Sequence, residues 1–370
     1  MTRQVAGALA VVADLHVVTP EGATARTTGD SVFTMHYLGS PIGRSAELRR
    51  DLLVEAVSDT GHVDDPGVLD EVGELLDQDL IDPWRTASDV LVDLRPDLAV
   101  IVGHQNLGAR AAIDRHLPDL PVALLALGTS SVSVGFPHFA KMFTRAQSVL
   151  AVTDSERRSI LEHHAGTGEV HRIGAPLAAN ASALSEPNTW VGDTGYVLVL
   201  TGVTNHREHH ENELSRLLRL RFPDTPVGIS HADTFCAWHE GRVNEGWPIE
   251  RSSDLARLMA WARVTVDLRP GTFFARRCVD SLLYGTPIVV PHDSRAREHA
   301  ERGRGGLWFE SPGELIWCVE ALLEPSAHDT FGAQGRSYAE DEYGSTDRFI
   351  DRVVGACGLP SAAATVGATA

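Results

Sequence analysis

The chain has 370 residues, of which 43% are hydrophobic and 22% charged, and its formal net charge is −18 at pH 7. This length suits two domains of about 150 to 200 residues, and the composition is that of a globular protein. No run of about 18 apolar residues is present, so no membrane span is predicted. The acidic balance argues against nucleic acid as the principal partner, because contacts to phosphate backbones need a basic surface.

The beginning of the chain and its cysteines indicate the expected compartment. An apolar stretch near the start is interrupted by Asp14 and His16, and no small-residue cleavage site follows it, so no signal peptide is predicted. The cysteines are widely spaced and form no C-x-x-C pair, which argues against a disulfide framework and a zinc site. We therefore expect buried thiols in the reducing cytosol and a cytoplasmic protein.

Short apolar runs alternate with helical patterns along most of the chain. The predicted strands are residues 15–18, 98–102, 122–127, 148–152, 197–200, 264–267 and 288–290. Predicted helices include residues 45–57, 82–93 and 254–262, the second with Asp82 as its cap and Pro83 at its first position. Continuous apolar strands separated by helices are typical of a parallel sheet covered on both faces, which is the doubly wound α/β class.

Turn-forming residues place the main domain boundary within residues 183–195. We therefore predict a Rossmann-like first domain over 1–187 and a second Rossmann-like domain over 188–337. Residues 338–357 are expected to form a terminal helix that packs back on the first domain, with a break at Gly344 and Ser345. Residues 358–370 are expected to be a disordered tail.

Two such domains would face each other across a cleft, with ligands outside the carboxyl ends of the strands. No G-x-G-x-x-G or G-x-x-x-x-G-K-[ST] motif follows a strand, which disfavours dinucleotide and P-loop chemistry. The G-x-S-x-G motif of the α/β-hydrolases is also missing from the sequence.

The stretch PGTFFARRCVDSLLYGTPIVVP, residues 270–291, follows the strand predicted at 264–267. A turn leads into a helix near Thr272, whose free amides and positive dipole end would form an anion site. Thr272, Arg276 and Asp280 are spaced by four and share one helix face, while Phe274 lies on another face and is expected to pack into the core. The alternative is that Arg276 and Asp280 form a solvent-exposed pair worth about 0.2–0.5 kcal/mol.

Residues 254–322 resemble the nucleotide-sugar domain of the GT-B glycosyltransferases, in particular the large retaining family of sucrose synthases and bacterial mannosyltransferases. That family has Glu-Gly-Phe-Gly after a strand, a second Glu eight positions after the first, and a Gly-x-Pro-Val-Val strand. Here residues 272–275 read Thr-Phe-Phe-Ala, Asp280 occupies the second acidic position, and residues 285–289 read Gly-Thr-Pro-Ile-Val. Residues 305–309 are in register, and the first domain resembles the family more loosely at residues 96–104, 153–156 and 173–176.

The resemblance implies roles for the matching residues. Asp280 would accept hydrogen bonds from the ribose hydroxyls of a nucleoside diphosphate, and the amides of Thr272, Phe273 and Phe274 would meet the diphosphate or the donor sugar. Arg276 would contact the diphosphate.

Two further residues are expected at this donor site by the same resemblance. Arg207 would neutralise the phosphates, and Glu250 would lie at the pocket edge near the base. No metal or other cofactor is required, because helix amides and arginine can hold the donor, a nucleoside diphosphate sugar.

The sequence departs from the family pattern at several positions. Thr272 replaces the first glutamate, and Phe273 and Ala275 replace glycines that let the backbone approach the sugar. The family's active-site histidine falls on Leu127 or Gly128. The chain aligns from the family's first helix, so the first domain is expected to lack its opening strand and glycine loop.

Three histidine-containing segments are further candidates for a functional role. His206 and His210 are four apart, but the glutamate spacing does not match H-E-x-x-H, and no metal site is predicted. His104 follows a predicted strand and is the candidate catalytic residue, positioning an acceptor hydroxyl or stabilising the leaving group; a structural role is the alternative. His299 lies beside a loop that resembles the family's donor-site loop, and we expect it to be solvent-exposed.

The leading hypothesis is a hexosyltransferase-type enzyme that moves a sugar, with retention, to a small-molecule, glycan or protein acceptor. The alternative is a catalytically degenerate GT-B scaffold that binds a nucleotide sugar or a protein partner without transfer. A nucleotide-sugar epimerase on the same fold is a weaker third hypothesis, because no histidine–acid constellation typical of it is evident.

Overall fold

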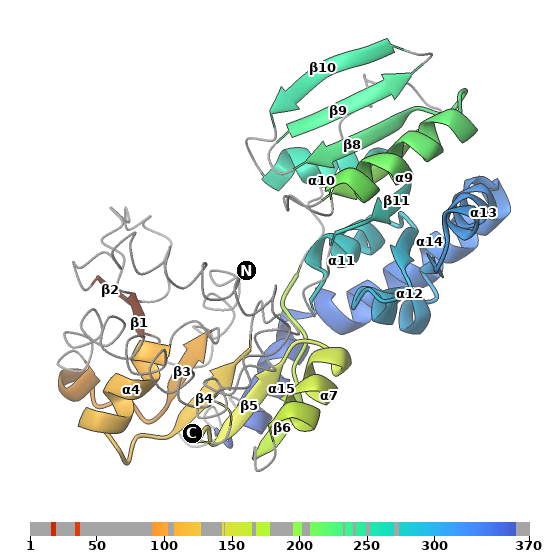
Figure 1. The fold of residues 1–370 in the computed structure, drawn as a ribbon. Coiled ribbons are helices and arrows are strands. Elements are labelled where there is room, and N and C mark those ends of the chain that lie inside the picture. Colours follow the sequence, from red (N-terminus) through yellow and green to blue (C-terminus); the bar gives the residue numbers. More distant parts are fainter. Residues whose placement is uncertain are drawn as a thin grey trace, which may run out of the picture. The chain divides into compact units, whose positions relative to one another are not determined.

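A computed structural model of the chain describes residues 16–19, 34–37, 91–102, 107–126, 143, 145–164, 168–177, 195–201, 208–231, 234–239, 242–248, 252–269 and 274–359. Contacts divide the chain into two units (Figure 1). Unit 1 comprises Met1–Pro176 and Thr346–Ala370, and unit 2 comprises Leu177–Ser345. The boundary predicted from sequence at 187/188 lies outside the described residues. Within the described part, no helix is long and apolar enough to cross a bilayer.

Unit 1 contains a parallel four-stranded sheet in the order β3-β4-β5-β6. Its strands are β3 (Ala99–Val102), β4 (Val122–Leu125), β5 (Ser148–Ala151) and β6 (Glu169–Arg172). All residues of β4 and β5 are buried, as expected for parallel strands covered on both faces. Two further strands, β1 (His16–Thr19) and β2 (Thr34–Tyr37), form a separate parallel pair.

The helices of unit 1 are α4 (Leu107–His116), α7 (Asp154–His163) and α15 (Thr346–Ala356). Helix α7 begins with a capping arrangement: Thr153 Oγ1 accepts a hydrogen bond from Glu156 N at 3.1 Å. The buried Glu156 carboxylate returns to accept the N–H of Val152 at 2.7 Å. The first bond satisfies an amide that the helix start leaves without an intrahelical partner, and the second ties the helix to the residue before its cap. Ser148 Oγ donates to Ala356 O at 2.6 Å and so ties the end of α15 to β5.

Unit 2 contains a seven-stranded sheet in the order β10-β9-β8-β7-β11-β12-β13. Five strands are parallel: β7 (Tyr196–Thr201), β8 (Val227–His231), β11 (Ala262–Asp267), β12 (Ile288–Pro291) and β13 (Gly306–Phe309). At one edge β9 (Thr234–His239) and β10 (Arg242–Pro248) run antiparallel, so β8, β9 and β10 form a meander. This antiparallel edge was not predicted from the sequence.

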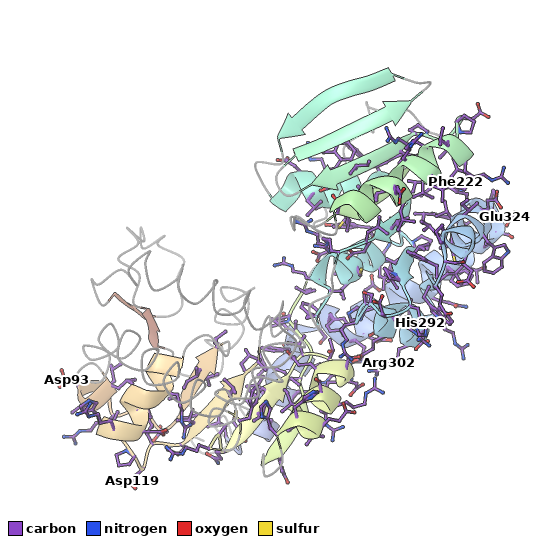
Figure 2. The ribbon with its side chains drawn as sticks, in the orientation of Figure 1. Asp93, Asp119, Phe222, His292, Arg302 and Glu324 are labelled. Carbon is purple, nitrogen blue, oxygen red and sulfur yellow. The ribbon has the colours of Figure 1, made fainter. Side chains whose placement is uncertain are left out.

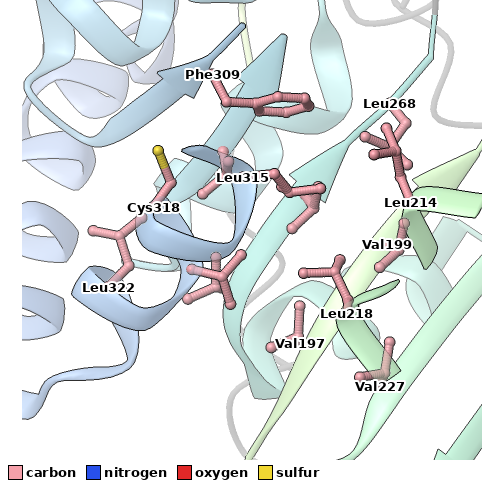
Figure 3. Packing of buried hydrophobic residues seen from close by; sticks show 14 residues of the cluster. Val197, Val199, Leu214, Leu218, Val227, Leu268, Phe309, Leu315, Cys318 and Leu322 are labelled. Carbon is pink, nitrogen blue, oxygen red and sulfur yellow. The ribbon is translucent and has the colours of Figure 1, made fainter. Parts of the chain in front are cut away.

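The central strand β7 is buried on both faces. Val197 and Val199 point to the face covered by α9 (Glu208–Arg221) and α13 (Pro312–Leu323), where the packing is shown in Figure 3. The remaining labelled side chains of that cluster are Leu214, Leu218, Val227, Leu268, Phe309, Leu315, Cys318 and Leu322. The alternate residues Leu198 and Leu200 pack on the other face, with Leu258 of α10 (Ser252–Trp261). This two-sided burial explains why the strand reads as a continuous apolar run.

The C-terminal helical segment of unit 2 contains α14 (Pro325–Ala339) and the π-helix η3 (Glu340–Gly344). Glu324, labelled in Figure 2, caps α14 by accepting hydrogen bonds from the amides of Ser326 and Ala327. Ser345 is extended and separates η3 from α15, so the helical run is broken where Gly344 and Ser345 predicted a break.

Candidate functional site

The strand order of unit 2 defines a topological switch point between β7 and β11. From β7 the chain continues through α9 to β8 on one side, whereas β12 and β13 lie beyond β11 on the other side. Connections that diverge from two adjacent parallel strands leave a crevice outside their carboxyl ends, where ligands bind in such sheets. These ends lie together because Asp267 of β11 pairs with Leu200 of β7.

Helix α11 (Arg276–Leu283) follows β11 and begins at this edge of the sheet. The residue before the helix is Ala275, whose side chain makes no capping hydrogen bond. Two amides of the first turn are already used, because Arg276 N donates to Phe274 O at 2.8 Å and Cys278 N donates to Ala275 O at 2.9 Å. The positive end of the helix dipole still favours an anion at this place.

An ion pair at the end of β11 fixes one arginine beside this helix. Arg269 Nε donates to Asp267 Oδ1 at 2.8 Å, and Arg269 Nη2 donates to Asp267 Oδ2 at 2.6 Å. The nearly buried Asp267 carboxylate also accepts from the Cys278 thiol at 3.2 Å. Burial, and then the Asp267 charge, raise the pKa of that thiol well above its usual range, so it remains a hydrogen-bond donor. The sequence predicts Asp267 at the end of a strand but not its pairing with Arg269.

Arg277, at the second position of α11, is half-buried. Its guanidinium makes no hydrogen bond or ion pair with any residue that the structure describes. Burial, followed by the charge of Arg269, lowers its pKa, and the carboxylates of Asp267 and Asp280 oppose this effect from a distance. A partly desolvated cation without a counter-charge is stabilised by a bound anion.

Arg276 and Asp280 meet on the outer face of α11, as their spacing predicted. Arg276 Nε lies 3.4 Å from Asp280 Oδ2, and the two side chains are 39% and 25% exposed. Burial raises the pKa of Asp280 despite the opposing charges of Arg276 and Arg277. The Arg276–Asp280 pair is therefore partly shielded from water, and Arg276 does not fully offset the cost of burying the Asp280 carboxylate. That carboxylate can accept further hydrogen bonds.

Phe274 directly precedes Ala275 at the start of α11, and its ring belongs to a buried aromatic cluster. Its ring centroid is 5.5 Å from that of Tyr343 and 6.3 Å from that of His299 on α12 (Arg297–Gly303). The prediction that His299 is solvent-exposed is wrong, because its side chain is fully buried and its Nδ1 lies 3.2 Å from Tyr338 Oη. Packing of α12 against α14 places this histidine in the interior.

The structure thus brings Phe274, Arg276 and Asp280 together with Arg277 and the Asp267–Arg269 pair. The other predicted site residues lie outside the described residues; these are His104, Arg207, Glu250, Thr272 and Phe273. Arg277 was missed by the sequence analysis although it is adjacent to Arg276, because nothing in the sequence distinguishes a paired arginine from an unpaired one.

Comparisons with known proteins place this geometry in a fold class. No sequence profile of a known family and no curated protein matches the chain. Among solved structures, the N-terminal domain of Candida albicans trehalose-6-phosphate phosphatase superposes with a TM-score of 0.66 at 8% identity, covering 95% of this chain and 92% of that chain. Sucrose-phosphate synthase from Thermosynechococcus elongatus superposes with a TM-score of 0.52 at 10% identity, covering 75% of this chain and 77% of that chain. Phytolacca americana UGT2, complexed with UDP-2fluoro-glucose and pterostilbene, superposes with a TM-score of 0.52 at 11% identity. The superposition covers 92% of this chain and 91% of that chain.

The chain therefore has the α/β fold of the GT-B glycosyltransferases, with two Rossmann-like domains, and the predicted fold class is confirmed. At these identities the likeness defines the fold, and the chemistry has to be argued from the residues at the end of β11.

Proposed function

We propose that this protein is a glycosyltransferase that moves a sugar from a nucleoside diphosphate sugar to an acceptor hydroxyl. The observation that carries the proposal is the position of Arg277: a half-buried cation, without a carboxylate partner in the described part of the chain, at the uncapped start of α11. That helix start lies at the switch point of the sheet, where a diphosphate would meet both its dipole and the guanidinium.

The remaining residues suit the other parts of such a donor. Asp280 lies one helical turn beyond Arg276 and has the partly exposed carboxylate that could accept hydrogen bonds from ribose hydroxyls. Arg269 and Asp267 compensate each other's charge, and their bidentate contact fixes the end of β11 beside the proposed diphosphate position. His104, Arg207, Glu250, Thr272 and Phe273 are proposed to complete the site.

In the proposed reaction, the bond between the anomeric carbon and the diphosphate oxygen breaks as the acceptor oxygen bonds to that carbon. The acceptor proton passes to the departing diphosphate, and the anomeric configuration is retained. The protein contributes positioning and stabilisation of the negative charge that develops on the leaving group. Arg277 and the positive end of the α11 dipole would act on that charge, whereas Asp280 would act on the remote ribose.

Binding and transfer can be tested on the full chain. Calorimetric titration with UDP, GDP and ADP and with their glucose conjugates identifies the donor. We expect Arg277→Gln to weaken binding of the preferred nucleotide by about tenfold or more, because a charge-assisted contact to the diphosphate is lost. Arg336→Gln is the matched control, since Arg336 is an exposed residue of α14 that pairs with Glu340 in a surface contact of 2.7 Å.

Failure of the wild-type protein to bind any of these nucleotides would rule out the proposal. Equal affinity of Arg277→Gln and the wild type for the nucleotide would show that Arg277 does not contribute to binding it. Nucleotide binding without sugar transfer across a panel of acceptors would indicate instead a GT-B scaffold that has lost catalysis.

A further inference from the structure

Four aromatic rings of unit 2 meet in the interior next to the start of α11. They belong to Phe274, which precedes α11, and to His299 of α12, Tyr338 of α14 and Tyr343 of η3. The side chains of Phe274, His299 and Tyr343 are buried, and α14 contacts both α11 and α12 (Figure 1). The cluster therefore connects the first residues of α11 to three other elements of the same unit.

His299 is the imidazole of this cluster, and a hydrogen bond fixes its orientation. Its Nδ1 lies 3.2 Å from Tyr338 Oη. The imidazole ring meets the Phe274 ring at 85°, with the centroids 6.3 Å apart, and the Tyr343 ring at 81° and 5.7 Å. Edge-to-face contacts of this kind depend on ring orientation and stabilise a pair beyond the area it buries. The bond to Tyr338 therefore sets the orientation in which His299 meets Phe274.

Tyr338 is itself held by the close approach of two helices. A Cβ added at Gly303, the last residue of α12, would lie 2.7 Å from Tyr338 Cδ1. The phenol ring thus already touches the backbone of α12 and has no room to move toward it. The hydroxyl that meets His299 is consequently presented by a rigid part of the fold.

Phe274 transmits its position to α11 through the backbone. Its carbonyl oxygen accepts the N–H of Arg276 at 2.8 Å, and the carbonyl oxygen of Ala275 accepts the N–H of Cys278 at 2.9 Å. These two residues therefore supply acceptors to the first turn of the helix. A shift of Phe274 would disturb the turn that carries Arg277.

We propose that His299 is a positioning residue: through its contact with Phe274 it holds the first turn of α11, and with it Arg277, in place. Because His299 is fully buried, it acts through Phe274 and not by contact with a ligand. The consequence for ligand binding rests on the proposed donor function, whereas the consequence for the first turn of α11 does not. If the cluster contributed only to the core, its loss would lower the stability of the fold without a separate effect on α11.

Two variants in the cluster and one outside it distinguish these roles. Tyr338→Phe removes the hydroxyl and keeps the ring, and His299→Leu removes the imidazole. Tyr196→Phe is the matched control, because the buried Tyr196 also donates its hydroxyl within unit 2, to Leu258 O. Tyr196 is the first residue of β7, whereas α11 begins at the carboxyl edge of the sheet. All three variants lose a hydrogen bond in the interior, but only two of them change the cluster.

Hydrogen exchange of the full chain without nucleotide, followed by mass spectrometry, measures the first turn of α11 directly. In Tyr338→Phe and His299→Leu we expect the amides of this turn to exchange about tenfold faster or more, beyond the change that urea unfolding assigns to global stability. Tyr196→Phe should lower global stability without that additional exchange. Tyr338→Phe retains the packing of the ring, so it tests the proposal even where His299→Leu folds poorly.

Calorimetric titration with the preferred nucleoside diphosphate then tests whether His299 acts through Arg277. We expect His299→Leu to weaken binding about threefold to tenfold in the wild-type background and to have no further effect in Arg277→Gln. The two losses are non-additive because a misplaced guanidinium and an absent one forfeit the same contact.

Two results would overturn the proposal. One is exchange at the start of α11 that is no faster in the two cluster variants than in Tyr196→Phe. The other is an equal loss of nucleotide affinity on adding His299→Leu to the wild type and to Arg277→Gln. A wild-type protein that binds no nucleotide would overturn the donor site itself, and the exchange measurement would still decide whether His299 holds α11.

Discussion

Asp267 and Arg269 form a bidentate ion pair at the carboxyl end of β11, with N–O distances of 2.8 and 2.6 Å. The carboxylate is nearly buried and the guanidinium is 24% exposed. Geometry of this kind fixes the fork of the arginine at the point where the chain leaves the sheet for α11. The pair therefore holds the edge of the candidate donor site in place before any ligand arrives.

Asp267→Asn should destabilise the protein by about 1–3 kcal/mol, because the partly buried Arg269 loses its counter-charge. Urea unfolding followed by circular dichroism measures this change. Glu320→Gln is the control, since the Arg221–Glu320 pair at 2.6 Å is exposed and is worth about 0–1 kcal/mol. Equal losses in the two variants would show that burial of the Asp267 pair has no energetic consequence.

Asp280→Asn should stabilise the protein at pH 7 while weakening nucleotide binding. Burial raises the pKa of Asp280 above its ordinary value of 3.8, so the folded protein holds this proton more tightly than the unfolded chain does. The contribution to stability is fully present below about pH 3.8 and is lost as the pH rises through the folded-state pKa. Asparagine mimics the neutral carboxyl group and avoids that loss.

Urea unfolding of both proteins at pH 7 and at a series of lower pH values tests this sign. The advantage of Asp280→Asn should shrink as the pH falls, because the wild-type carboxyl becomes protonated as well. A variant that is less stable than wild type at pH 7 would show that the ion pair with Arg276 outweighs the burial of the carboxylate.

Gly332→Ala should destabilise unit 2 by about 1–3 kcal/mol, whereas Gly355→Ala should be neutral or stabilising by up to about 1 kcal/mol. A Cβ at Gly332 on α14 would collide with the backbone oxygen of Gly285, whose φ of +77° ends α11 in a left-handed turn. A Cβ at Gly355 meets nothing. Thermal unfolding of the two variants compares the same Gly→Ala substitution at a closely packed position and at an open one. Equal changes in unfolding temperature would contradict the close approach of α14 to Gly285.

Thr153→Ala should destabilise the protein by about 0.5–2 kcal/mol through loss of the α7 cap, since the amide of Glu156 would lose its acceptor in a buried setting. Thr153→Ser keeps the hydroxyl and is expected to retain most of the stability. Chemical denaturation distinguishes the two variants. If serine is as damaging as alanine, the methyl group of Thr153 matters more than its oxygen.

Several strands of the parallel sheets could be predicted because their signal is local, whereas the parallel strands β2, β6, β8 and β13 were not predicted. Residues 122–127, 148–152, 197–200, 264–267 and 288–290 were predicted as strands, and β4, β5, β7, β11 and β12 occupy these stretches. A strand buried on both faces needs apolar side chains at every position, and this requirement is visible in the sequence. The antiparallel strands β9 and β10 were not predicted, because their sequence, which includes His239, Arg242 and Glu245, mixes polar with apolar residues.

The sequence by itself determined the fold class and the position of α11 after a strand, including the contact between Arg276 and Asp280, which follows from helical spacing. Only the tertiary structure decided which charged side chains pair with a group of opposite charge. Asp267 pairs with Arg269 rather than Arg277, and His299 is buried rather than exposed, because these outcomes depend on how distant helices pack around the end of β11 and around α12. Burial and counter-charges are properties of the assembled fold, and they set the chemistry of the proposed donor site.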